Sequence, residues 1–572
     1  MYNRELIGDI APLTLMTGFF NGVRFDVRVV ALVCVPLLLT IPSNSAMTAR
    51  RWQRLWLIFC SSLVIFLGIV ELDFYREFHQ RLNGLVLQYI REDPATVLSM
   101  LWHGFPVIKL LLAWGVGTYV MALCLSALDK KTRTVNPRNK PISEPLWYTR
   151  LIVFVLLFLL SITAGRGTLR QGPPLRWGDA FTTDSVFVNH LGLNGVLTLY
   201  TAIVNQMSDH RNNLVQGVLP EGQALQLTRN LLMEEKDQLI DLDSAAIRRI
   251  SESADDLRLP IKNVVVILME SFAGRFVGAL GSKADITPNF DHLASEGLLF
   301  KRFFSNGTHT HQGMFATMTC FPNVPGFEYL MQTPEGGYQF SGLPQLLSRQ
   351  NFDDVYVYNG DFAWDNQRGF FSNQGMNNFV GRDDFDNPVF SDPTWGVSDQ
   401  DMFDRAHSEL LNLHKNKKPF YALLQTLSNH TPYALPKNLP MNKVIGYGTL
   451  NQHLTAMRYS DWALGEFFEK ARKAPYFNDT LFVIVGDHGF GTPEQLTEID
   501  LYRFHVPLLL VGPSVTETFG NKNFIVGSQV DIVPTIMGRI SANVQHQCWG
   551  RDLLNLSQHD QGFAIIKPSG GN

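Results

Sequence analysis

An acidic residue follows a short, continuously apolar stretch near the middle of the chain. Residues 264–269 read Val-Val-Val-Ile-Leu-Met, and Glu270 comes next. Such a run is typical of a strand buried on both faces of a mostly parallel sheet. Ligands bind at the carboxyl ends of such strands, so Glu270 is a candidate metal ligand or acid/base group. For this stretch alone, a solvated or helix-capping Glu is an equal alternative.

A second apolar stretch repeats this layout. Residues 481–485 are apolar, and Asp487 and His488 lie just beyond them. Two buried strands therefore deliver Glu, Asp and His to what could be one edge of a sheet. Carboxylate oxygen with imidazole nitrogen suits Mn²⁺ or Zn²⁺, whereas an all-oxygen set would favour Mg²⁺ or Ca²⁺.

A polar turn between these stretches could supply a nucleophile. It reads Asn306-Gly-Thr-His-Thr-His-Gln-Gly313 and precedes the apolar residues 314–318. A turn of this kind ahead of a helix offers backbone N–H groups to an anion, and Thr310 can present a hydroxyl that a metal or base activates. Read by itself, the turn fits Thr308 or Thr310 as a helix N-cap at least as well.

These residues sit within an alternation of strands and helices. Helical periodicity occurs at residues 399–413 and 454–472. The apolar runs that predict buried strands are residues 264–269, 355–358, 421–426, 481–485 and 506–511. The alternation predicts a doubly wound or related α/β sandwich.

The first part of the chain has a different composition. Four strongly apolar stretches occur there, at residues 28–42, 55–72, 106–128 and 148–165. The second and third are long enough for membrane helices, which need about 20 apolar residues; the first and fourth are shorter. Residues 10–20 are also apolar, but the stretch is brief and contains Pro12 and Gly18, so no span is expected there.

Basic residues in the loops predict the orientation. One loop holds Arg50, Arg51 and Arg54, and another holds Lys130, Lys131, Arg133, Arg138 and Lys140. Both loops should be cytoplasmic, which places the chain after Gly165 outside the cytoplasm. The expected parts are a membrane domain (1–165), a juxtamembrane connector (166–260) and a catalytic domain (261–572). The net charge of −4 and the lack of a basic arm argue against nucleic-acid binding.

Taken in order, the motifs resemble the lipoteichoic acid synthase family, membrane-anchored phosphoglycerol transferases of the sulfatase/alkaline phosphatase superfamily. Glu270 after a buried strand, Thr310 in a glycine-rich turn and the later Gly-Asp-His-Gly carry the resemblance. The resemblance also includes Asn21-Gly-Val-Arg-Phe-Asp26. Several further motifs look like the Gram-negative branch: Tyr358-Asn-Gly-Asp-Phe-Ala-Trp-Asp-Asn366 followed by Arg368-Gly-Phe-Phe371, Ser428-Asn-His-Thr-Pro-Tyr433 and Asp531-Ile-Val-Pro-Thr535.

The resemblance implies an α-helical multi-span membrane domain followed by an extracytoplasmic α/β domain of alkaline phosphatase/sulfatase-like fold. The protein would lie in the bacterial cytoplasmic (inner) membrane, with the catalytic domain on the periplasmic or extracellular side. Glu270, Asp487 and His488 would hold one divalent ion, Mn²⁺ in the family's usual form, with Mg²⁺ or Zn²⁺ as alternatives. Thr310 would complete the shell as the nucleophile.

The resemblance also implies substrate-binding residues. His430 matches the family's substrate-binding histidine, and His309 stands where a basic residue could bind the phosphate or its glycerol. Asp361, Trp364 and Arg368 match the stretch that contacts the headgroup. In Gram-positive members Asn-Arg follows the Trp closely, whereas here Asp-Asn-Gln intervenes before Arg368.

The implied reaction transfers glycerophosphate. Attack on phosphatidylglycerol would release diacylglycerol, leave glycerophosphate on Thr310, and pass it to a glycan or a growing glycerophosphate chain. The Gram-negative character of the motifs favours a glucan. The nearest alternatives are a phosphoethanolamine transferase and a plain phosphodiesterase. A non-catalytic lipid-binding regulator would have lost ligands or nucleophile, and all four of those residues are present.

The cysteines bear on a further alternative. A sulfatase proper would need Cys or Ser followed by x-Pro-x-Arg, but Cys320-Phe-Pro-Asn-Val324 ends in Val. We therefore interpret Cys320 as structural. Cys320 and Cys548 could pair in an oxidising compartment, although sequence separation gives no distance in space.

Overall fold

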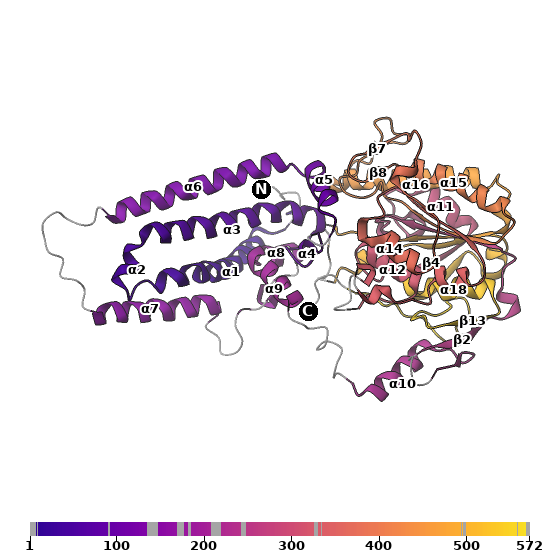
Figure 1. Ribbon diagram of the computed structural model, residues 1–572, viewed down its shortest axis with the longest axis horizontal. Coiled ribbons are helices and arrows are strands. Elements are labelled where there is room, and N and C mark those ends of the chain that lie inside the picture. Colours follow the sequence, from indigo (N-terminus) through magenta and orange to yellow (C-terminus); the bar gives the residue numbers. More distant parts are fainter. Residues whose placement is uncertain are drawn as a thin grey trace. The chain divides into compact units, whose positions relative to one another are not determined.

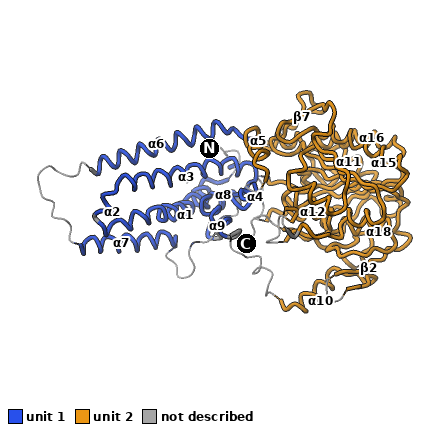
Figure 2. Tube along the Cα trace, viewed as in Figure 1, with its two compact units in different colours: residues 1–90, 105–208, 492–498 blue, residues 91–104, 209–491, 499–572 orange. Residues whose placement is uncertain are grey.

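Figure 1 shows a computed structural model of the chain. It describes residues 7–8, 10–89, 92–133, 147–168, 175, 177–180, 183, 185–207, 219–241, 247–324, 330–332, 334–492, 495, 499–557 and 559–567. The chain forms two compact units (Figure 2): residues 1–90, 105–208 and 492–498, and residues 91–104, 209–491 and 499–572. The residues of the expected connector (166–260) are divided between these two units.

The first unit is helical. Three of its described helices are long and apolar enough to cross a membrane: α3 (Arg50–Phe78), α6 (Val107–Arg133) and α7 (Trp147–Arg166). The stretches 10–20 and 28–42 belong largely to one helix, α1 (Pro12–Leu38), rather than to a short segment and a separate span. The shorter helices of this unit are α2 (Asn44–Thr48), α4 (Leu85–Tyr89), α8 (Val186–Leu191) and α9 (Gly195–Met207).

Helices α3 and α6 pack side by side in opposite directions. Trp114 Nε1 donates to the Ser62 carbonyl at 3.1 Å, and Arg50 Nε lies 2.8 Å from Asp129 Oδ1. The basic start of α3 and the basic end of α6 therefore share one end of the bundle, as the predicted cytoplasmic loops require. Arg138 and Lys140 of the second loop lie outside the described residues.

The second unit is built on an eight-stranded mixed sheet. The strands follow one another across the sheet as β12 (Lys522–Ser528), β4 (Leu298–Phe304), β11 (Leu508–Val511), β10 (Thr480–Gly486), β3 (Asn263–Met269), β9 (Phe420–Gln425), β5 (Asp353–Tyr358) and β6 (Phe379–Val380). Strands β10, β3, β9, β5 and β6 are parallel, whereas β11 runs antiparallel to both of its neighbours. All seven residues of β3 and of β10 are buried, as their unbroken apolar sequence predicts.

Helices cover both faces of this sheet (Figure 1). Helices α11 (Pro288–Glu296), α15 (Asp399–Lys415) and α16 (Asn451–Ala471) share one apolar core with alternate strand residues such as Val355 and Val357. Tyr356 points to the other face, where its hydroxyl meets Met314 Sδ of α12 (Thr310–Thr319) at 3.6 Å. Helices α13 (Leu343–Ser348), α14 (Gln367–Asn373) and α18 (Ile532–Ile540) complete the main helices of this unit.

A small sheet joins the connector to the end of the chain. Strand β2 (Arg249–Glu252) pairs with both β1 (Gln238–Leu239) and β13 (Asn543–His546), and α10 (Glu221–Leu232) precedes it. The buried Arg249 donates to the carbonyl oxygens of Cys548 and Gly550 at 3.0 Å each. This pairing explains why the polar part of the connector belongs to the second unit.

A disulfide links α12 to the same region. Cys320 follows the last residue of α12 and is bonded to Cys548, 228 positions away. The sequence left this pairing open. Its presence agrees with the interpretation of Cys320 as structural and not as the precursor of a sulfatase nucleophile.

Replacing Cys320 and Cys548 together by Ser should lower the free energy of unfolding of the second unit by about 2–5 kcal/mol, because the cross-link restrains the unfolded chain. Scanning calorimetry of the full chain in detergent measures this, with Cys34, Cys60 and Cys124, which are free, replaced by Ser as the control. Identical melting of the double variant and wild type, with and without reductant, would contradict the prediction.

Candidate active site

Two adjacent strand ends place the first two acidic residues. In the parallel pair β3 and β10, Met269 lies opposite Gly486, so the next residues, Glu270 and Asp487, leave the sheet at the same level. The Asp487 N–H donates to the Met269 carbonyl at 3.1 Å and extends the ladder by one bond. The carboxyl edge of the sheet is thus the place where the two side chains meet.

His488 completes a compact ligand set. One ligand atom from each of Glu270, Asp487 and His488 lies within 4.8 Å of the others, and His488 Nε2 is 3.5 Å from Asp487 Oδ2. His488 Nδ1 donates to the Gly489 carbonyl at 2.7 Å, which leaves the Nε2 lone pair free to bind a cation. Asp487 Oδ2 is buried and has no hydrogen-bond partner in the described part of the chain. Two oxygens and one nitrogen in this arrangement fit a divalent cation.

Burial sets the charge of this cluster. Burial, with a further contribution from Asp487, raises the pKa of Glu270 to about 7. Burial raises the pKa of Asp487 to about 7 as well, although backbone N–H groups of His488 and Ser271 donate to it. Burial lowers the pKa of His488. A divalent cation would restore both carboxylates to their charged form by compensating for the lost hydration.

Thr310 lies at the same place. It is the first residue of α12, and its Oγ1 donates to Glu270 Oε2 at 3.0 Å and lies 3.5 Å from His488 Nε2. Helix α12 can approach this closely because Gly313 has no side chain: a Cβ there would lie 2.0 Å from the Asp487 carbonyl oxygen. The nucleophile candidate and the ligand set therefore form one site.

Two buried amides hold the loops of this site together. Gln529 Nε2 donates to the carbonyl oxygens of Gly486 and Asp487, and its Oε1 accepts from the Asn306 N–H at 2.8 Å. Asn429 Nδ2 donates to the carbonyls of Glu270 and Ser271 at 3.1 and 3.2 Å. Each amide therefore ties a second loop to the ends of β10 or β3.

The part of the chain that carries this site is similar to known proteins. The family model described as Sulfatase matches residues 262–542. The chain carries a sulfatase-family domain. The sequence is similar to lipoteichoic acid synthase 1 of Bacillus subtilis (strain 168), with 27% identity over 328 residues, which are 53% of this chain and 50% of that protein. The chain thus spans about half the length of the curated relatives it matches.

Solved structures give the same fold. A protein in the alkaline phosphatase superfamily from Vibrio parahaemolyticus shares 29% identity, covers 60% of this chain and 81% of its own, and superposes with a TM-score of 0.54. The lipooligosaccharide phosphoethanolamine transferase A of Neisseria meningitidis covers 96% of this chain and 98% of its own at a TM-score of 0.52, with 15% identity. The expected fold class, helices followed by a sulfatase/alkaline phosphatase-like α/β domain, is confirmed.

An aromatic wall stands beside the ligand set of the sulfatase-family domain. The centroid of the His430 ring lies 4.3 Å from that of Trp395, and the Trp364 ring lies 5.0 Å from Trp395. Trp395 Nε1 donates to the Thr431 carbonyl at 2.7 Å, which holds the His430 loop. A positive charge on His430 would lower the pKa of Glu270, so the imidazole lies close enough to interact with the cluster. His430 and Trp364 thus occupy neighbouring positions, and Trp395 joins them.

The other predicted substrate residues are placed differently. His309 precedes Thr310, and its ring lies 6.3 Å from that of His488; burial and the neighbouring His311 lower its pKa, so it is neutral. Its Nε2 has no hydrogen-bond partner among the residues described. Asp361 forms an ion pair with Arg382 at 2.9 Å. The exposed Arg368 stacks 5.4 Å over Phe379 of β6 and is not brought into the cluster.

One group of residues was not predicted from the sequence. Asp365 is buried beside α12, with Oδ1 3.8 Å from His311 Nδ1. Glu92 accepts from the Asp365 N–H at 3.3 Å, and Gln332 Nε2 donates to both carboxyl groups. Burial, followed by the charge of Glu92, raises the pKa of Asp365 well above its usual value. Glu92 lies between two predicted membrane spans, where no sequence motif indicates a role.

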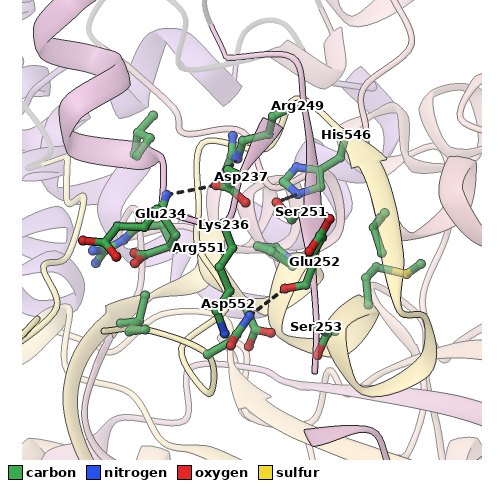
Figure 3. Close-up of a pocket in the computed structure, with 18 of the residues that line it drawn as sticks. Glu234, Lys236, Asp237, Arg249, Ser251, Glu252, Ser253, His546, Arg551 and Asp552 are labelled. Carbon is green, nitrogen blue, oxygen red and sulfur yellow. Dashed lines mark hydrogen bonds and ion pairs between the residues drawn. The ribbon is translucent and has the colours of Figure 1, made fainter. Parts of the chain in front are cut away.

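A cavity elsewhere in the domain is a separate feature. It has a volume of about 250 Å³ and lies between β2, β13 and α18 (Figure 3). Its charged groups are largely paired: Asp237 contacts Arg249 at 3.0 Å, and Ser251 is 2.9 Å from His546 Nε2. None of Glu270, Thr310, Asp487 and His488 lines it. The chemistry therefore belongs to the strand ends and not to this cavity.

Gly313→Ala should separate α12 from the ligand set, because the new methyl group would overlap the Asp487 carbonyl. We expect at least a tenfold loss of divalent-metal affinity, measured by metal analysis after dialysis against graded metal concentrations. Gly222→Ala in α10 is the control, because nothing lies within 4 Å of a Cβ there. Equal metal retention by both variants would show that the close approach is unimportant.

Metal binding should weaken as the pH falls below about 7. Glu270 and Asp487 both have a pKa of about 7 without metal, so a cation must displace protons from them in acid. The apparent Kd for Mn²⁺ should rise about tenfold or more per pH unit from pH 6.5 to 5.5 and level off above about 7.5. In the metal-free protein the same shifts reduce folding stability as the pH rises from about 4 to 7, because the unfolded chain loses these protons first.

Titration calorimetry in two buffers of different ionisation enthalpy measures both the affinity and the protons released. Asp487→Asn removes one titrating ligand and should reduce the number of protons released as well as the affinity. An affinity independent of pH, with no proton release, would mean that these carboxyls are already ionised in the metal-free protein.

Proposed function

We propose that the protein is a membrane-anchored, metal-dependent phosphotransferase that moves glycerophosphate from phosphatidylglycerol to an extracytoplasmic glycan or glycerophosphate acceptor. The observation that carries this proposal is the contact of the Thr310 hydroxyl with the Glu270, Asp487 and His488 ligand set. The similarity to lipoteichoic acid synthases supports the donor, and the sequence motifs that look like the Gram-negative branch favour a glucan acceptor.

Thr310 acts as the nucleophile in the proposed first step. Glu270, Asp487 and His488 would hold a divalent cation, Mn²⁺ in this proposal, which would lower the pKa of the hydroxyl and neutralise charge on the phosphodiester. Thr310 Oγ1 bonds to phosphorus as the bond from phosphorus to the diacylglycerol oxygen breaks. Diacylglycerol leaves with a proton, and glycerophosphate stays on Thr310. His430 would interact with the phosphate, because its half-buried imidazole lies near enough to Glu270 to influence the pKa of that carboxyl group.

The second step regenerates the hydroxyl. An acceptor hydroxyl attacks the same phosphorus in line, and Thr310 Oγ1 leaves and regains a proton. His309 remains neutral, because burial lowers its pKa, and its free Nε2 can accept a hydrogen bond from the glycerol or the acceptor. Trp364 and Trp395 provide the apolar wall that shields the phosphoryl group from water.

The membrane anchor fits this reaction. The donor lipid and the released diacylglycerol both remain in the bilayer, so an enzyme fixed there keeps access to both. Helices α3, α6 and α7 would provide the anchor, and the basic ends of α3 and α6 support a position of the second unit outside the cytoplasm. The Cys320–Cys548 disulfide suits the oxidising conditions of that compartment.

Thr310→Ala should abolish transfer. Wild type incubated with Mn²⁺ and headgroup-labelled phosphatidylglycerol should release diacylglycerol and gain one glycerophosphate by intact mass; the variant should lose at least about 10³-fold in rate, because the covalent route is gone. Thr518→Ala, which changes an exposed threonine of α17 (Val515–Phe519), is the control.

Phosphatidylethanolamine tested in parallel separates the alternatives. Diacylglycerol from this lipid alone would replace the proposal with phosphoethanolamine transfer. Diacylglycerol and free glycerophosphate with no adduct or acceptor product would indicate a phosphodiesterase. No product from either lipid would favour a lipid-binding protein without catalysis.

A further inference from the structure

Helix α5 (Pro94–Gly104) has an unusual outer face. It belongs to the second unit, yet three large apolar side chains are exposed on it: Leu98 is 66% exposed, Leu101 40% and Trp102 57%, with His103 exposed beside them. These positions are spaced i, i+3 and i+4, so they form one stripe, which Ala95 extends towards the start of the helix. Helices on the surface of soluble domains show the opposite pattern, with polar residues facing out.

The opposite face of α5 packs on the sulfatase-family domain. Met100 is buried, and Ser99 Oγ and its carbonyl each lie 3.5 Å from Thr394 Oγ1. A Cβ on Gly104 would lie 3.8 Å from Pro432 Cβ. Thr394 precedes Trp395 in the turn between β7 (Ser391–Asp392) and β8 (Gly396–Val397). Helix α5 therefore lies on the loops that carry the aromatic wall and His430.

Both ends of α5 are fixed. Asp93 accepts from the Thr96 N–H and hydroxyl at 2.8 Å each, which caps the start of the helix. Just before it, Glu92 is bound to Asp365 and Gln332. The orientation of the apolar stripe is thus set by contacts at the cap, along the inner face and at Gly104.

The chain leaves α5 directly for the membrane. Only Phe105 and Pro106 separate Gly104 from Val107, the first residue of the candidate span α6. The three Cα–Cα steps from Gly104 to Val107 reach about 11 Å at most, so the C-terminal end of α5 stays at the membrane boundary when α6 spans it. A tryptophan at such a boundary and an uncharged apolar stripe suit the interface between headgroups and acyl chains.

We infer that the Leu98, Leu101 and Trp102 stripe of α5 rests on the lipid bilayer and forms the side of the active site that faces the membrane. The inference deepens the proposed function and rests on it for the identity of the substrate. A lipid held along this stripe keeps its acyl chains in the bilayer while its headgroup reaches the loops of Trp395 and His430. The stripe then determines access for bilayer lipids and not the chemistry at Thr310.

Membrane contact can be tested without turnover. A spin label is placed on Leu98→Cys, and separately on Ile445→Cys, in full-length protein whose Cys34, Cys60 and Cys124 are replaced by Ser. Ile445 is the matched control, since it is apolar, 80% exposed and on the same unit. In phosphatidylglycerol-containing vesicles, the label at 98 should be several-fold more accessible to oxygen than to a water-soluble nickel complex, and the label at 445 should show the reverse. Equal accessibility of the two sites to the nickel complex would overturn the inference.

Kinetics then separates lipid access from catalysis. Leu98→Asp combined with Leu101→Asp should reduce diacylglycerol release from vesicles at least tenfold, with little change for a water-soluble phosphodiester of glycerol and nitrophenol. Ile445→Asp should change neither rate. Equal loss on both substrates, or no loss on vesicles, would overturn the inference. If wild type releases no diacylglycerol, the proposed donor fails, whereas the accessibility result still decides whether α5 meets the bilayer.

Discussion

The structure depends on placing two carboxyl groups side by side in a buried position. Glu270 and Asp487 leave adjacent parallel strands at one level, and burial together with mutual repulsion opposes their ionisation. In low dielectric surroundings such a pair is stable only when protonated or when a cation lies between them. The register of β3 and β10 alone therefore brings together two buried carboxyl groups that need a positive charge in order to ionise.

The surrounding residues supply little positive charge of their own; they hold the loops in place so that a cation can bind. His488 contributes a neutral nitrogen, because burial lowers its pKa and the bond from Nδ1–H to the Gly489 carbonyl leaves Nε2 as the nitrogen with the lone pair. Gln529 is uncharged and joins the loop after β10 to the turn before α12. A fixed cationic side chain in the same place would compete with a metal for the carboxylates. Neutral donors hold the loops without doing so, and the hydroxyl of Thr310 can share the same cation.

The sequence predicts the central strands and the residues that follow them better than the outer strands of the sheet. Unbroken apolar runs identified β3, β5, β9 and β10, and the residues just after β3 and β10 proved to be the ligand candidates. Strand β4 was missed because Lys301 and Arg302 interrupt its apolar pattern, and β12 because half-exposed edge residues do not form a continuous run. An unbroken apolar run indicates a strand that is buried on both faces. This signal therefore identifies strands in the middle of the sheet and misses strands at its edges.

Residues that act through contacts distant in sequence could not be predicted in this way. Arg368 matched a motif, but the insertion before it places the guanidinium over Phe379. Trp395 shows no local signal, and its role follows only from packing against Trp364 and His430.

Glu92 illustrates a further limit of sequence reasoning, because its partner Asp365 is more than 250 positions away. Both carboxyls accept from Gln332, and Asp365 favours the protonated form because burial and Glu92 raise its pKa. A buried pair of this kind holds together only while hydrogen-bond donors lie between the oxygens. The segment that begins α5 is therefore fixed to the sulfatase-family domain by polar contacts beside α12, and its apolar face remains available for the bilayer.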